Sequence, residues 1–134
     1  MAEADARRRV AIVVFDEVEV LDFAGPFEVF SALRLDEATR RESSSPYEVI
    51  VAGVRPGLVH CRGGLKVQPD CTIAELDPAS LDTLVVPGGY GVRPLLKDGA
   101  FLDWLRGAAP QPRRLASVCT GSLLLAEAGQ LDGV

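Results

Sequence analysis

The feature that most constrains the fold is a run of six consecutive apolar residues, Val10 to Phe15. The run is rich in β-branched side chains and has no polar residue at alternate positions, as expected of a strand buried on both faces of a sheet. Similar runs follow at residues 47–53, 81–87 and 115–118, and helix-like segments separate them. This alternation predicts an α/β fold with a doubly wound, mostly parallel sheet and helices on both faces.

Two segments have the pattern of amphipathic helices. Gly25 and Pro26 are expected to open the first, because proline is favoured in the first turn of a helix, and this helix is expected to run to about Thr39. The second helix is expected at residues 99–109, with Asp98 as its N-cap. The helix-forming pattern therefore agrees with the layered fold that the strands predict.

A small β-hairpin is predicted between the second and third strands. Short runs at residues 58–61 and 65–68 flank Arg62-Gly-Gly64, which is typical of a tight turn. His60 lies in this hairpin, which the expected topology places far from the carboxyl edge of the sheet. We therefore interpret His60 as a surface residue and not as a catalytic base.

Length and charge limit the function. A chain of 134 residues is expected to form a single domain, 1–134, with residues 1–9 as a flexible tail. The net charge of −5 argues against nucleic acid or an anionic membrane surface as a partner. The first apolar run is too short for a signal peptide or a membrane span, which predicts a cytoplasmic protein. Three scattered cysteines and one histidine predict no metal site.

Cys119 stands where the strand-like run 115–118 turns into the Leu/Ala-rich run 122–128, which Gly129 ends. Backbone N–H groups and the helix dipole favour a thiolate at such a junction, and Gly121 permits a tight turn. This is the logic of a nucleophile elbow with cysteine in place of serine. A buried core cysteine fits the same segment equally well.

The loops after three strands are expected to meet at the carboxyl edge, where open parallel sheets bind ligands. Gly88 and Gly89 form either an ordinary tight turn or a place where their N–H groups, with that of Thr120, stabilise negative charge. Asp22 and Glu28 flank the segment Phe-Ala-Gly-Pro-Phe in the first loop. Asp22 either caps the first helix or exchanges a proton beside the thiol, and its spacing favours the cap.

Three motifs in this order resemble the ThiJ/PfpI superfamily, whose flavodoxin-like fold is shared with class I glutamine amidotransferases. The motifs are LDFAGPFEVF at 21–30, VVPGGYGVRPLL at 85–96 and SVCTGSLLLAEAGQLDG at 117–133. The resemblance covers almost the whole chain and is nearest to isonitrile hydratases. It implies Cys119 as the nucleophile and Asp22 as its acid/base partner. Further site residues that it implies or leaves as candidates are Gly88, Gly89, Thr120, Tyr90, Glu28 and Gly25.

The resemblance implies an enzyme that hydrates a small-molecule isonitrile to an N-substituted formamide through a Cys119 thioimidate. Such a lyase uses no cofactor, and the resemblance implies a homodimer. Two alternatives stay open: a non-catalytic sensing domain related to the amidase-like domain of AraC-type transcription regulators, and a redox or stress-response protein with an oxidisable Cys119. Because relatives continue beyond the elbow helix with a Thr/His-containing segment, the chain is expected to lack the C-terminal part of the family domain.

Overall fold

The computed structural model describes residues 7–134, and its centre is a five-stranded sheet in the order β5-β2-β1-β6-β7. The strands are β1 (Arg8–Val14), β2 (Tyr47–Gly53), β5 (Cys71–Thr72), β6 (Thr83–Val86) and β7 (Arg114–Ser117). All of their pairings are parallel. The predicted mostly parallel sheet is therefore confirmed, with the edge strand β5 added to it.

The central strand β1 forms the middle of the hydrophobic core. Its residues from Val10 to Val14 are completely buried, as the continuous apolar run requires. Ile12 pairs with Val51 of β2 on one side and with Val85 of β6 on the other. Each such side chain contributes about 1.5–3 kcal/mol when it is fully buried. This burial anchors the strand whose carboxyl end leads into the candidate site.

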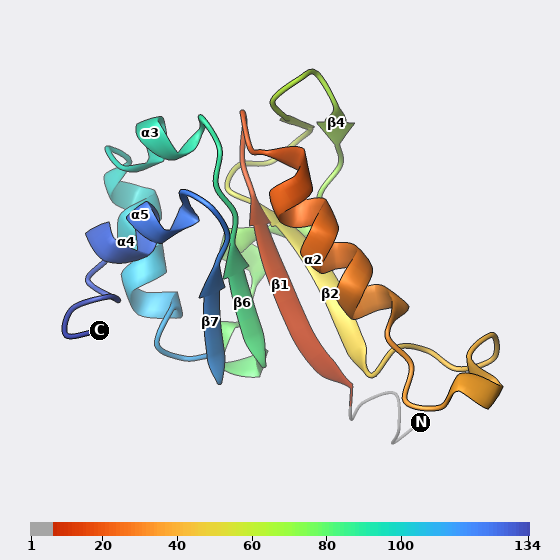
Figure 1. The fold of residues 1–134 in the computed structure, drawn as a ribbon. Helices are drawn as coiled ribbons and strands as arrows, with labels where there is room; N and C mark the ends of the chain where they lie inside the picture. Colours follow the sequence, from red (N-terminus) through yellow and green to blue (C-terminus); the bar gives the residue numbers. More distant parts are fainter. Residues whose placement is uncertain (1–6) are drawn as a thin grey trace.

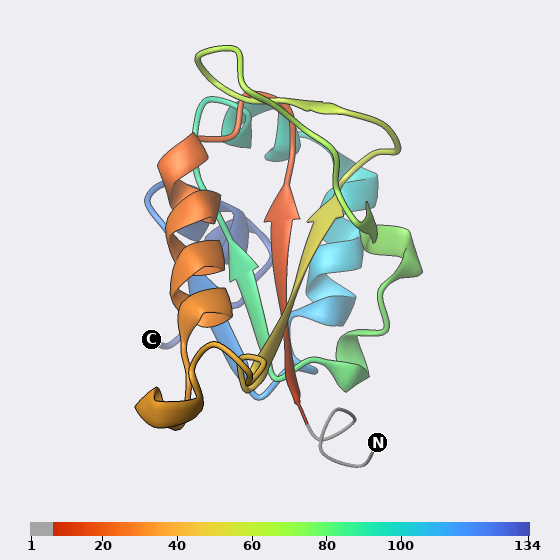
Figure 2. The same ribbon diagram turned by 90° about the vertical axis from the view of Figure 1, so that its right-hand side faces the viewer.

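Helices cover both faces of the sheet, as predicted (Figures 1 and 2). Helix α2 (Val20–Ala32) packs on β1 and β2, and α4 (Gly99–Ala108) lies on the opposite face. The short helix α3 (Val92–Leu95) and the elbow helix α5 (Gly121–Glu127) pack against each other and against α4. The predicted N-cap of α4 is confirmed, because Asp98 Oδ1 accepts a hydrogen bond from the Phe101 N–H (3.1 Å).

Helix α2 differs from its prediction at both ends. It begins at Val20, five residues before Gly25, and ends at Ala32, well before Thr39. Pro26 therefore lies inside the helix, where it removes one backbone hydrogen bond. Burial of the Phe23 side chain in the additional first turn offsets that loss.

The prediction of a flexible tail at residues 1–9 is wrong for residues 7–9. Residues 1–6 lie outside the described part of the chain, whereas Arg8 and Arg9 belong to β1. The Arg7 side chain donates hydrogen bonds to the carbonyl oxygens of Ser45 (3.0 Å) and Tyr47 (2.9 Å). Residues 7–9 are thus held by the start of β2.

The predicted hairpin is present as the antiparallel pair β3 (Val59–His60) and β4 (Lys66–Val67). Three 3₁₀ turns that the sequence pattern did not indicate complete the secondary structure: η1 (Glu37–Thr39), η2 (Ile73–Glu75) and η3 (Pro78–Ser80). Over the described residues, no helix combines the length and the apolarity that a membrane crossing requires. Figure 1 shows the hairpin and α3 at the same end of the molecule as the carboxyl ends of the long strands.

Candidate active site

The loops that follow β1, β6 and β7 meet at the carboxyl edge of the sheet. The Glu19 N–H donates to the Gly88 carbonyl oxygen (3.0 Å), which joins the first loop to the second. The Gly89 N–H donates to Thr120 Oγ1 (3.0 Å), which joins the second loop to the elbow. The loop that leads from β1 into α2 and Asp22, the glycine pair and the elbow of Cys119 are therefore joined in series by hydrogen bonds.

Gly88 is required by the close approach of the elbow. A Cβ atom placed on Gly88 would lie 2.6 Å from both the N and the Oγ1 of Thr120. Likewise, a Cβ atom on Gly121 would collide with the Val86 carbonyl oxygen. The absence of side chains at both glycines lets the turn after β7 pack directly on the loop after β6.

Cys119 is exposed and lies between β7 and α5, as the elbow interpretation predicts. Its φ of 52° is in the left-handed region, which non-glycine residues rarely adopt. Strained conformations of this kind cost about 1–3 kcal/mol and are concentrated at functional sites. Among the described residues, the N–H groups of Cys119 and Thr120 have no hydrogen-bond acceptor. The elbow thus presents a thiol beside two available donors.

Asp22 lies in the first turn of α2 and is buried, with 7% of its surface exposed. Its Oδ2 accepts a hydrogen bond from the Gly88 N–H (3.2 Å). No side chain caps α2, whose N-cap residue is Glu19, so the helix-cap interpretation of Asp22 is wrong. The carboxyl group instead points to the glycine loop, and Oδ1 has no hydrogen-bond partner among residues 7–134.

The glycine N–H groups are already used within the protein. The Gly88 N–H donates to Asp22 and the Gly89 N–H donates to Thr120, so neither is free in this structure to bind an oxyanion. Among the described residues, the N–H groups of Thr120 and Cys119 are the donors of this loop cluster that remain available. The sequence could not show which backbone donors are occupied and which are free, because the two hydrogen bonds join residues 66 and 31 positions apart.

The remaining candidates occupy different surroundings. Tyr90 is exposed at the rim, where the Arg62 guanidinium lies 4.3 Å from its ring centroid. Glu28 lines an open groove of about 530 Å³ beside Phe27 and Val51, and no hydrogen bond joins it to the glycine loop. Gly25 has no atom within contact distance of an added Cβ, so its position requires no glycine. Of these three, only Tyr90 belongs to the loops that meet at Cys119.

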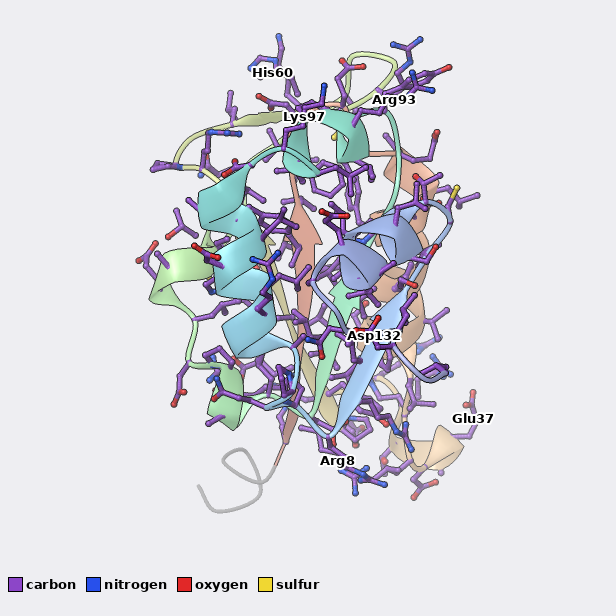
Figure 3. The ribbon with its side chains drawn as sticks, turned by 90° about the vertical axis from the view of Figure 1, so that its left-hand side faces the viewer. Arg8, Glu37, His60, Arg93, Lys97 and Asp132 are labelled. Carbon is purple, nitrogen blue, oxygen red and sulfur yellow. The ribbon has the colours of Figure 1, made fainter. Side chains whose placement is uncertain are left out.

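The hairpin was expected far from the carboxyl edge, and that expectation is wrong. The Glu17 N–H donates to the His60 carbonyl oxygen (2.8 Å), and the His60 N–H donates to Asp16 Oδ1 (2.9 Å). The Arg62 N–H donates to the Val18 carbonyl oxygen (3.0 Å). The hairpin therefore lies across the loop after β1, although the His60 side chain itself projects into solvent (Figure 3).

The other two cysteines are less suited to nucleophilic chemistry. Burial, followed by the charge of Asp16, raises the pKa of the buried Cys61 thiol. Burial and then the charges of Glu75 and Asp70 raise the pKa of Cys71, and Arg9 partly opposes this change. Within the described chain, no group of three His, Cys, Asp or Glu side chains is arranged to hold a metal ion.

Comparisons of the sequence and of the structure with known proteins point to the same family. The isonitrile hydratase of Pseudomonas putida is 37% identical over 127 residues, which are 93% of this chain and 49% of that protein. The protein named Deglycase PYRAB04690, from Pyrococcus abyssi, is 27% identical over 93% of this chain and 68% of its own length. The family thus includes proteins named for different enzymatic activities.

Solved structures agree with the fold. A crystal structure of a ThiJ/PfpI family protein from Pseudomonas syringae matches with a TM-score of 0.81 and 25% identity, over 95% of this chain and 48% of that one. The chain spans about half the length of this protein and of the isonitrile hydratase. The model of the DJ-1/PfpI family matches residues 8–134. The chain therefore belongs to the DJ-1/PfpI family.

Proposed function

We propose that the protein is a cysteine-dependent enzyme that adds water to an isonitrile and releases an N-substituted formamide. The observation that carries the proposal is the exposed Cys119 thiol on a strained elbow. The neighbouring Thr120 accepts a hydrogen bond from Gly89, and the adjacent Gly88 donates one to the buried carboxyl group of Asp22. The 37% identity to an isonitrile hydratase over 93% of the chain supports this reaction among those of the family.

The reaction balances with these two side chains and water. The Cys119 thiolate forms a bond to the terminal carbon of R–N≡C, and the Asp22 carboxyl group delivers a proton to that carbon, which gives the thioimidate R–N=CH–S–Cys. Water then adds to the same carbon and gives a proton back to Asp22. The remaining hydroxyl proton moves to nitrogen, and cleavage of the C–S bond as the carbonyl forms releases R–NH–CHO and regenerates the thiolate.

The two oxygens of Asp22 suit this double use. Oδ2 is fixed by the Gly88 N–H, so the carboxyl group has a defined position. Oδ1 is not engaged by the described protein groups and is available to carry the transferred proton. The free Thr120 N–H supports the proposal, because a backbone donor beside the thiol can stabilise charge that develops as sulfur attacks.

The test is to incubate the protein with cyclohexyl isonitrile and to measure the formamide by mass spectrometry. Cys119→Ala is expected to remove turnover, whereas the matched Cys71→Ala variant retains it. Asp22→Asn keeps an acceptor for the Gly88 N–H but cannot donate the carboxylic proton, so it should lower the rate by about 10²–10⁴-fold. Turnover that survives Cys119→Ala would contradict the assignment of the nucleophile.

A further inference from the structure

The rim of the Cys119 site carries two arginines and a tyrosine that the proposed reaction does not use. The guanidinium carbon of Arg62 lies 4.3 Å from the centroid of the Tyr90 ring, and that of Arg93 lies 6.0 Å from it. Arg62 comes from the hairpin between β3 and β4, whereas Tyr90 precedes α3 and Arg93 lies in it. Three segments therefore place two cations around one aromatic ring.

The backbone holds Arg62 in this position. The Arg62 N–H is bonded to Val18, and its Nη1 donates to Glu17 Oε2 (3.1 Å). Glu17 has a φ of 65°, and the Gly91 N–H donates to its carbonyl oxygen (3.3 Å). About half of the Arg62 side chain is exposed, and a guanidinium has five N–H donors, so Arg62 keeps donors for a ligand.

Arg93 is the freer of the two arginines. Its side chain is exposed and forms no ion pair or hydrogen bond with the described residues. Figure 3 shows it projecting from the end of the molecule where the long strands finish, on the same end as Lys97 and His60. Its planar guanidinium is suited to bidentate recognition of a carboxylate.

Most acidic groups of the same edge are already engaged. Asp16 accepts from the His60 N–H, Asp22 accepts from the Gly88 N–H, and Glu17 is paired with Arg62. These hydrogen bonds do not cancel the charges of Asp16 and Asp22, but the charged groups gathered at the Tyr90 ring are two guanidiniums and the one carboxylate of Glu17. Glu19, like Asp16, is an exposed carboxylate of this stretch, and both oppose the binding of an anionic ligand.

The cluster lies within reach of the reactive thiol. The bond between the Gly89 N–H and Thr120 Oγ1 limits the Cα atoms of Tyr90 and Cys119 to a separation of at most about 15 Å. A substrate long enough to span this separation can therefore bind the arginines with one end while its isonitrile carbon meets sulfur.

We propose that Arg62 and Arg93, which flank Tyr90, bind a carboxylate at the end of the substrate remote from its isonitrile group. This assignment rests on the proposed function and narrows its substrates to ω-isocyano carboxylates. Arg93 binds the carboxylate directly, and Arg62 both binds it and positions the Tyr90 ring.

The first test compares 6-isocyanohexanoate with its neutral methyl ester. Arg93→Gln is expected to lower kcat/KM for the acid about tenfold or more, as for loss of a hydrogen bond between charged groups, and to leave the ester within about twofold. Arg106→Gln on α4 is the matched control, because Arg106 pairs with Asp103 outside the site. Equal losses for acid and ester, or no loss for either, would overturn the proposal.

The second test does not require turnover. Cys119 is labelled with the anionic 2-sulfonatoethyl or the cationic 2-(trimethylammonio)ethyl methanethiosulfonate, and the rates are followed on its peptide by mass spectrometry. At about 10–15 Å, a unit charge changes each rate about 1.6- to 2-fold in water, so Arg93→Gln should lower the anion-to-cation rate ratio about two- to fourfold. Glu19→Gln should raise the same ratio.

The two tests separate the two proposals. If no isonitrile is hydrated but the labelling ratio responds as expected, the proposed reaction fails and the anion-binding cluster stands. If isonitriles are hydrated while neither substrate preference nor labelling ratio changes in Arg93→Gln, the cluster has no role in binding and this inference is wrong.

Discussion

Replacing Cys119 by glycine should stabilise the protein relative to replacing it by alanine. At a φ of 52°, a side chain costs about 1–2 kcal/mol, and glycine does not incur this cost. Glycine has more conformational freedom than alanine in the unfolded chain, and this destabilises the glycine variant by about 0.5–1 kcal/mol. Because the thiol is exposed, little burial is lost in either variant. The net expectation is that Cys119→Gly is more stable than Cys119→Ala by about 0.5–1 kcal/mol.

The measurement is urea unfolding of both variants, supported by thermal melts, in which a change of 1 kcal/mol shifts the Tm by about 2–4 °C. Ala126→Gly is the matched control, because Ala126 is exposed in helix α5 with ordinary helical geometry. There the same alanine-to-glycine change should destabilise the protein by about 0.5–1 kcal/mol. If Cys119→Gly is less stable than Cys119→Ala by a similar amount, the elbow is not strained and the reasoning is refuted.

Two further predictions follow from the titrating groups. Maleimide labelling at pH 7.5, followed by peptide mass spectrometry, should modify Cys119 first, Cys71 more slowly and Cys61 last. The reason is that burial and raised pKa values protect Cys71 and Cys61. Labelling of Cys61 before Cys119 would contradict this order. Hydrogen bonds from the Thr72 N–H and hydroxyl lower the pKa of Glu75 below its usual 4.5. The charged carboxylate therefore stabilises the fold fully above pH 4.5, and this stabilisation is lost as the pH falls through the lowered pKa of the folded protein. The free energy of unfolding of Glu75→Gln should therefore lie below that of the parent protein at pH 7, with a difference that shrinks towards pH 3.

The sheet could be predicted because its determinants are local. The run from Val10 to Phe15 is apolar at every position, and only a strand covered on both faces buries such a run completely. The N-cap of α4 is likewise a local signal, since Asp98 bonds an N–H group three residues away. Cys119 was recognised at a strand–helix junction for the same reason: strand, turn and helix are contiguous in the chain.

The rest of the site depends on contacts between distant residues. Proline at position 26 favoured a helix start there, but burial of Phe23 and the hydrogen bond that the Gly88 N–H donates to Asp22 extend α2 by another turn. The hairpin was misplaced because its position is set by bonds between His60 and the loop after β1, more than 40 residues earlier. Neither the hydrophobic periodicity nor a turn motif in the sequence indicates contacts between residues so far apart.

The strain at the carboxyl edge has a common structural cause. Glu17 and Cys119 are the non-glycine residues with positive φ among those described, and each follows a strand of the same sheet. Each is held from outside its own loop: Glu17 by bonds to His60 and Gly91, and the turn at Cys119 by the fit of Gly121 under Val86. A relaxed backbone at either position would move the thiol or Arg62 away from the glycine loop. The strain is therefore the cost of bringing the Cys119 thiol, the Asp22 carboxyl group and Arg62 to one edge, which is the arrangement that the proposed reaction requires.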